Sequence, residues 1–248
     1  MTQVAPPPHA LHPPACLVTR PEPEGSRFAD LLVERFALSP LLSPLLRVEP
    51  VNVSIPVDTA RGVILTSAHG ARRLAELDLP RALPCYTVGD KTAQVARAFG
   101  YQPVSAGGDA QALVALIKAE HPATPLFHLR GEHSRGEVAH QLSSVGILCR
   151  DIVVYRQIAQ DLTLPAQALL RGTESVILPL FSPRTAALFR DAGPHGAPLV
   201  PVAMSAAVAQ SLGTAATVAK APTETAMVTA LAQLPIIRAW VEKAGLPS

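Results

Sequence analysis

The stretch GVILTSAHGARRLAEL at 62–77 carries the pattern that decides the fold: an apolar strand, a polar turn and an amphipathic helix. The same unit returns as SVILPLFSPRTAALF at 175–189. Each copy is followed by a second strand and helix, CYTVGDKTAQVARAFG at 85–100 and PVAMSAAVAQSLG at 201–213. Such alternation indicates an α/β fold with parallel sheets flanked by helices. The repeat further indicates two similar domains of this kind.

Two segments interrupt the alternation, because 43–55 and 149–159 are extended patterns with no helix of their own. One complete set of strands and helices lies between them and another lies outside. We therefore expect them to pair as a two-stranded linker. It would join a discontinuous first domain, residues 16–42 plus 160–248, to a second domain of residues 56–148. A single (β/α)8 barrel is the alternative, since about eight strands can be counted, but a barrel requires neither the repeat nor the linker segments.

Proline makes up 25 of the 248 residues, about twice the usual share. Five prolines lie in the opening segment 1–15, which we expect to be a disordered tail. This segment has neither a basic region nor an apolar core, so it is no signal peptide, and a cytoplasmic location is expected. Many other prolines fall at strand–helix junctions, where a fixed φ and a missing N–H are tolerated. Cys16, Cys85 and Cys149 lie in apolar strand patterns and are expected to be buried, reduced thiols.

The balance of charge excludes several classes of protein. Lys and Arg number 21 against 19 Asp and Glu, a formal net charge of +2. We therefore expect no nucleic-acid partner held by bulk phosphate neutralisation. The apolar runs are too short for a membrane span. No nucleotide-binding, nucleophile-elbow or zinc-protease motif is found, and His128 and His133 have no third metal ligand near them, so no metal is expected.

Helix starts are predicted from capping residues. Ser26 is expected to cap the helix in SRFADLLVERFAL at 26–38, and Asp90 to cap the helix after VG at 88–89.

Hydroxyl residues and a glycine recur where a strand ends and a helix begins. They are Thr66, Ser67, Gly89, Thr92, Ser134, Ser182 and Ser205. Basic residues lie at the same ends: Arg20, Lys91, Arg130, Arg135 and Arg184. Each hydroxyl alone is explained by a helix cap, and each basic residue by a solvated surface. In open parallel sheets, however, ligands bind beyond the carboxyl ends of the strands, where helix N-termini favour anions. Together these residues predict a site for a ligand with several carboxylates or phosphates.

A series of motifs resembles the uroporphyrinogen-III synthase family in kind and in order. They are LVTRP (17–21), LTSAHGA (65–71), VGDKTA (88–93), LRGEHSRGEVAHQL (129–142), DIVVYR (151–156), FSPRTA (181–186), AMSAAVA (203–209) and APTETAMVTAL (221–231). The resemblance implies two α/β domains joined by a two-stranded linker, with the active site in the cleft between them. It also implies a cofactor-free lyase of tetrapyrrole biosynthesis. This enzyme closes the linear tetrapyrrole hydroxymethylbilane to uroporphyrinogen III, with loss of water and inversion of the last pyrrole ring through a spirocyclic intermediate.

The substrate implied by the resemblance is a polycarboxylate, which agrees with the anion site predicted at the strand ends. Unassisted closure does not invert the ring, so the protein must control the outcome by positioning. The expected partners are this small molecule alone, with no nucleic acid and no membrane. A monomer is expected, and a transient contact with the preceding enzyme of the pathway stays open.

The resemblance assigns residues by motif. Tyr155 matches the cleft tyrosine and is the expected catalytic residue, which donates a proton or a hydrogen bond to the departing hydroxyl. Thr92 matches the threonine of the VG..TA turn, and Ser67 and Ser182 match the hydroxyls of the two related strand ends. The expected substrate-binding residues are Arg20, Thr66, Ser67, Gly89, Thr92, Arg130, Gly131, Ser182 and Ser205. The alternatives are a two-domain protein that only binds a small anion, an inactive homologue, and a Tyr155 that merely packs at the domain junction.

Overall fold

The computed structural model describes residues 12–133 and 137–246. The chain divides into two compact units, one formed by Met1–Arg47 with Ala159–Ser248 and the other by Val48–Ile158. Most of the predicted tail at 1–15 lies outside the described residues, and Ala15 already belongs to the first strand. The linker boundaries at 43–55 and 149–159 stay predictions.

The first unit contains a parallel sheet with the strand order β11-β10-β9-β1-β2. The strands are β1 (Ala15–Val18), β2 (Ser39–Leu42), β9 (Val176–Leu180), β10 (Leu199–Ala203) and β11 (Thr217–Val218). Successive strand residues point to opposite faces. Cys16 and Val18 accordingly lie in one apolar cluster and Leu17 in the other. Both faces of this sheet are therefore buried.

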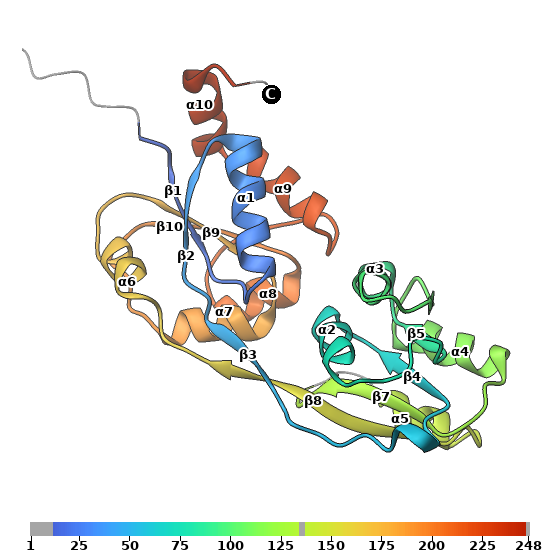
Figure 1. The fold of residues 1–248 in the computed structure, drawn as a ribbon. Coiled ribbons are helices and arrows are strands. Elements are labelled where there is room, and N and C mark those ends of the chain that lie inside the picture. The colour runs from blue at the N-terminus through green and yellow to red at the C-terminus, as the bar shows by residue number, and fades with distance from the viewer. Residues whose placement is uncertain (1–11, 134–136, 247–248) are drawn as a thin grey trace, which may run out of the picture. The chain divides into compact units, whose positions relative to one another are not determined.

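Helices cover both faces of this first sheet (Figure 1). One face packs against α1 (Glu24–Phe36), α9 (Glu224–Ala232) and α10 (Pro235–Ala244). The other packs against α6 (Leu164–Leu170), α7 (Pro183–Asp191) and α8 (Ala206–Leu212). Phe28 is fully buried under the first set and Phe189 under the second.

The second unit contains a sheet with the strand order β3-β8-β7-β4-β5-β6. The strands are β3 (Leu46–Pro50), β4 (Gly62–Leu65), β5 (Cys85–Thr87), β6 (Pro103–Ser105), β7 (Leu126–Gly131) and β8 (Cys149–Ala159). β8 through β6 are parallel, and the added edge strand β3 makes the sheet mixed. A short 3-10 helix, η1 (Val57–Thr59), precedes β4.

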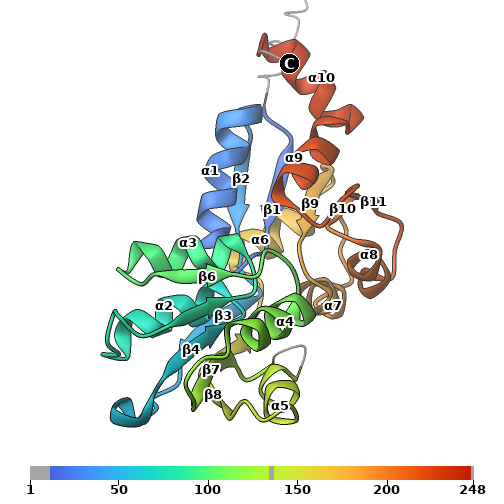
Figure 2. The ribbon, with the colours of Figure 1, turned by 90° about the vertical axis from the view of Figure 1, so that its right-hand side faces the viewer.

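Helices cover both faces of the second sheet as well (Figure 2). α2 (Ala68–Glu76) and α3 (Asp90–Ala98) pack on one face. α4 (Ala110–Glu120) and α5 (Val138–Ser143) pack on the other.

The two sheets share one arrangement, because β2-β1-β9-β10-β11 corresponds in order to β8-β7-β4-β5-β6. The repeat seen in the sequence is the run β4-α2-β5-α3-β6-α4 against β9-α7-β10-α8-β11-α9. The predicted α/β fold with two similar halves is confirmed, and a single barrel is excluded by two open sheets. In each sheet the strand order reverses at one place, between β1 and β9 and between β7 and β4. Ligands of open α/β sheets bind beyond the carboxyl ends of the strands at this place.

Both capping predictions were wrong by a few residues. α1 begins at Glu24, after Pro23, and the backbone N–H and hydroxyl of Ser26 bond the Glu22 carboxylate. The helix begins two residues before Ser26, which therefore lies inside the first turn and donates to Glu22 instead of capping. α3 begins at Asp90, so the cap position belongs to Gly89 in extended backbone. Asp90 instead adds a negative charge to the first turn, which the helix dipole favours.

The predictions for the cysteines are confirmed: Cys16, Cys85 and Cys149 are buried and free. Burial raises the pKa of each thiol to about 12. No described helix is long and apolar enough to cross a membrane.

A β-bulge lies where β7 ends beside β8. Arg130 pairs with Val153, but Gly131 pairs with Tyr155, so β8 has one residue more than β7 here. The Tyr155 ring crosses over Gly131 so closely that a Cβ at Gly131 would lie 2.7 Å from the ring carbons Cε2 and Cζ. Only glycine fits beneath this ring.

The substitution Gly131→Ala is expected to lower the free energy of unfolding by about 1–3 kcal/mol, the usual cost of overpacking. Urea denaturation measures it. In a Tyr155→Ala background the ring is gone, so the same substitution should cost little. An equal cost in both backgrounds would contradict the proposed clash.

Candidate functional site

Ser67 and Tyr155 form a hydrogen-bonded pair. Ser67 follows the carboxyl end of β4, and Tyr155 lies inside β8, opposite the last residue of β7. Ser67 is the N-cap of α2, and its Oγ accepts the Gly70 N–H at 3.0 Å. The same Oγ lies 2.9 Å from the Tyr155 hydroxyl. Tyr155 is 7% exposed, and this burial raises its pKa above the usual value, although the bond to Ser67 opposes the shift. The phenol therefore keeps its proton at neutral pH.

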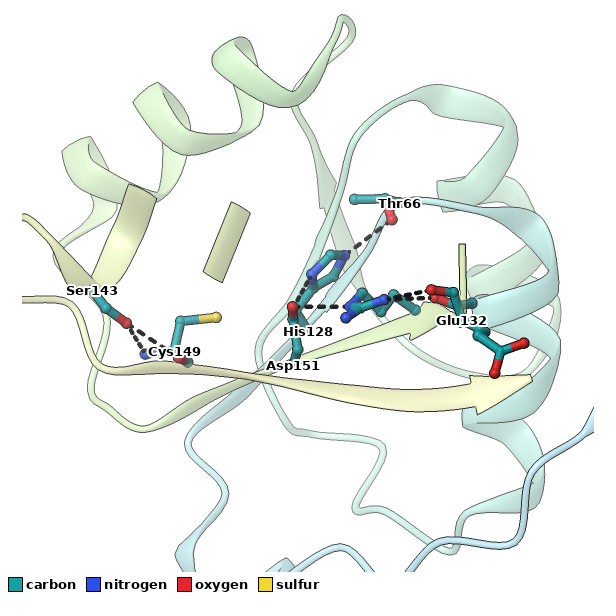
Figure 3. Close-up of polar contacts among 8 residues, drawn as sticks. Thr66, His128, Glu132, Ser143, Cys149 and Asp151 are labelled. Carbon is teal, nitrogen blue, oxygen red and sulfur yellow. Dashed lines mark hydrogen bonds and ion pairs between the residues drawn. The ribbon is translucent and has the colours of Figure 1, made fainter. Parts of the chain in front are cut away.

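A second polar group joins β4, β7 and β8 (Figure 3). Thr66 Oγ1 is 3.0 Å from His128 Nε2, and His128 Nδ1 is 2.8 Å from Asp151 Oδ1. The second carboxylate oxygen of Asp151 pairs with Arg130 Nε at 2.9 Å. Arg130 also donates to the carbonyls of Gly131 and Glu132. The group thus links the end of β4 to the interior of β7 and the first half of β8.

His128 is 1% exposed. Burial lowers its pKa below the ordinary value, more than the contact with Asp151 raises it. The ring is therefore neutral at pH 7, and its contact with Asp151 is a hydrogen bond of a neutral imidazole.

The turn after β5 supplies Gly89 and Thr92. Gly89 is the N-cap of α3, and the space around its Cα is open. Thr92 is the third residue of the helix and is 6% exposed, so its side chain is almost fully covered within this unit. The open part of the turn is therefore the backbone around Gly89.

In the first unit, Arg20 and Ser182 lie at the point where the strand order reverses. Arg20 Nη1 pairs with Glu224 at 2.9 Å, and its guanidinium carbon lies 3.9 Å from the centroid of the Phe181 ring. Burial lowers the pKa of Arg20, and the bond to Glu224 opposes this. Ser182 caps α7, since its Oγ accepts the Thr185 N–H at 3.1 Å. Arg20 is thus fixed by a carboxylate and an aromatic face.

Ser205 takes the N-cap position of α8 but makes no side-chain capping bond. Its backbone carbonyl accepts the N–H groups of Val208 and Ala209. Ser134 and Arg135 lie outside the described residues.

The predicted residues thus fall into two sets, one at each sheet. Thr66, Ser67, Arg130, Gly131 and Tyr155 are brought together in the second unit, and Arg20 and Ser182 in the first. Four residues that hold these sets in place were not predicted from the sequence: His128, Asp151, Phe181 and Glu224. A polar residue inside an apolar strand, as His128 is in LFHLRG, was the one available signal, because a buried polar group needs a partner.

The chemistry that these groups offer is hydrogen bonding and proton transfer. The second unit supplies a protonated phenol, two hydroxyls and a guanidinium at one edge. The first unit supplies the Arg20 guanidinium and the N-terminus of α7, which begins just after β9. Among the described residues, no group of three or more His, Cys, Asp or Glu side chains could hold a metal ion.

Comparison with solved structures shows the same fold in two bacterial proteins. The uroporphyrinogen-III synthetase of Helicobacter pylori is 18% identical, with a TM-score of 0.65 over 88% of this chain and 97% of that one. A mutant uroporphyrinogen III synthase of the extremely thermophilic bacterium Thermus thermophilus is 17% identical, with a TM-score of 0.52 over 93% and 99%. At these identities the likeness shows the fold alone. A search of curated proteins gave no match.

The family is shown by a sequence model rather than by these structures. The model described as Uroporphyrinogen-III synthase HemD matches residues 26–229. This range includes the site residues described above except Arg20, which follows β1. The chain therefore belongs to the uroporphyrinogen-III synthase family, whose members are cyclising enzymes of tetrapyrrole synthesis.

Proposed function

We propose that this chain is a uroporphyrinogen-III synthase that closes hydroxymethylbilane, with inversion of the last pyrrole ring and loss of water, and without a cofactor. The family match over residues 26–229 is the observation that carries the proposal. The polar groups at the strand ends support it, because they offer what a polycarboxylate substrate requires.

The substrate carries its charge as carboxylate arms, and the chain has a formal net charge of only +2. In the second unit, helices α2 and α3 begin directly at strand ends, after Ser67 and Gly89. Free N–H groups and the positive end of the helix dipole favour an anion at such places by roughly 0.3–1 kcal/mol each. Several weak contacts of this kind hold a polyanion without a large excess of basic residues. Arg130 adds a guanidinium to this unit, although Asp151 balances part of its charge.

Tyr155 is the proposed proton donor. In the dehydration, the C–O bond of the hydroxymethyl group breaks and the oxygen leaves as water, while the ring carbon that forms the closing bond later loses a proton. Ser67 Oγ accepts from Gly70 and can donate its own proton to the Tyr155 oxygen. The phenol proton is then free for the departing hydroxyl. Since the pKa of Tyr155 is raised, this proton is present at neutral pH.

The same arrangement limits where Tyr155 can act. The ring lies over Gly131, and His69 lies beside it with 5.5 Å between ring centroids. A donor held in this way acts on one position of a bound substrate, which is what control of ring orientation requires.

The proposal is tested by product analysis. Purified protein given freshly made hydroxymethylbilane is expected to yield the type III isomer, as measured by chromatography of the oxidised porphyrins. Heat-inactivated protein should give the unassisted type I product. Type I alone from the native protein would overturn the proposal and favour a non-catalytic anion-binding protein or an inactive homologue.

The substitution Tyr155→Phe removes the phenol proton and keeps the ring. It is expected to lower kcat by about 100-fold or more, the usual contribution of a positioned acid, while the protein stays folded. Tyr86→Phe is the matched control, because Tyr86 is a buried tyrosine on another strand, β5, of the same sheet. An unchanged kcat in Tyr155→Phe would show that the phenol takes no part in the mechanism, and that the protein acts only by positioning the substrate.

A further inference from the structure

Thr66, His128 and Asp151 form a line from the end of β4 across β7 to β8 (Figure 3). Thr66 is partly exposed, His128 is buried, and Asp151 is held on its other oxygen by Arg130. Among the residues that the structure describes, no hydrogen bond other than the one to His128 uses Thr66 Oγ1. The line therefore ends in a hydroxyl oxygen at the strand edge.

With His128 neutral, as its lowered pKa favours, the hydrogen bonds fix which way each proton points. A carboxylate only accepts, so Asp151 requires the proton on His128 Nδ1. A neutral imidazole carries one N–H, so Nε2 is then an acceptor. Thr66 must donate its hydroxyl proton to Nε2. The order of groups is that of a hydrolase triad, but the dehydration proposed above transfers no acyl group. The three groups instead fix the polarity of the Thr66 hydroxyl, that is, the direction in which its proton points.

Thr66 consequently cannot bind a carboxylate, because its one proton is already donated to His128. Its remaining lone pair can accept a hydrogen bond from a ligand. Each ring of the proposed substrate carries a pyrrole N–H, which is such a donor. This distinguishes Thr66 from the helix N-termini, whose N–H groups are suited to the carboxylate arms.

We infer that Thr66 accepts a hydrogen bond from a pyrrole N–H of the linear tetrapyrrole, and that His128 and Asp151 are positioning residues that hold its hydroxyl in this polarity. The inference rests on the proposed function. It assigns Thr66 to a ring of the substrate rather than to a carboxylate arm.

The first test needs no substrate. Long-range 15N–1H NMR of the full chain at neutral pH reports which nitrogen of His128 carries the proton. The Nδ1–H tautomer is expected, and the Nε2–H tautomer would overturn the inference. In Asp151→Asn the Nε2–H form should increase. Asp191→Asn, which removes an exposed carboxylate paired with Arg190, should leave the His128 signal unchanged.

The second test measures kinetics with hydroxymethylbilane. Thr66→Val keeps the shape and removes the hydroxyl, and it is expected to raise KM by about three- to tenfold, the effect of one neutral hydrogen bond, with a smaller change in kcat. Thr66→Ser should keep KM within about twofold of the native value, because the acceptor is retained. An unchanged KM in Thr66→Val would overturn the inference.

A double-mutant cycle separates Thr66 from Arg130, which also contacts Asp151. Asp151→Asn is expected to raise KM in the native background and to raise it less in a Thr66→Val background. An effect of the same size in both would show that Asp151 acts through Arg130 and would overturn its assignment to Thr66. Formation of the type III isomer by the native protein is measured first. Its absence contradicts the proposed function, whereas its presence with an unaffected Thr66→Val contradicts only this inference.

Discussion

Burial of each sheet on both faces is the constraint on which the rest of the structure depends. Helices cover both sides of β9 and of β4, and every residue of these two strands is buried. Side chains of a fully covered sheet meet solvent only where the strands end. The polar residues Thr66, Ser67 and Ser182 accordingly lie in the first positions after a strand. A site on such a fold is confined to its strand ends, and the reversal of strand order decides which ends lie side by side.

The bulge at Gly131 is a second constraint, because it decides where the Tyr155 side chain lies. In a regular ladder without the bulge, Val154 would pair with Gly131, and the Tyr155 side chain would point to the other face of the sheet. With it, the ring crosses Gly131 and its hydroxyl meets Ser67. A single glycine and one residue of register therefore place the phenol on the first turn of α2. The position of a proton donor is here a property of the backbone as much as of the tyrosine.

Much of the fold could be predicted from the sequence, because apolar strands and amphipathic helices of regular length alternate along it. The caps Ser67 and Ser182 were also visible, since each hydroxyl precedes its helix directly. The Ser26 cap failed because the helix begins two residues earlier, at Glu24, so that Ser26 lies in the first turn and donates its N–H and hydroxyl to Glu22. The pairing of His128 with Asp151 was not predictable, since the residues are 23 positions apart and meet only through the register of β7 on β8.

Thr66 and Ser67 show why residue type alone does not define a binding contact. Both are hydroxyls at the end of one strand, yet their neighbours give them different polarity. Thr66 donates its only proton to His128, whereas Ser67 accepts from a backbone N–H and keeps a proton that it can donate. A partner on the neighbouring strand thus decides whether a hydroxyl meets an N–H or an anion. Contacts set by backbone N–H groups and by the direction of hydroxyl hydrogen bonds therefore require few particular side chains.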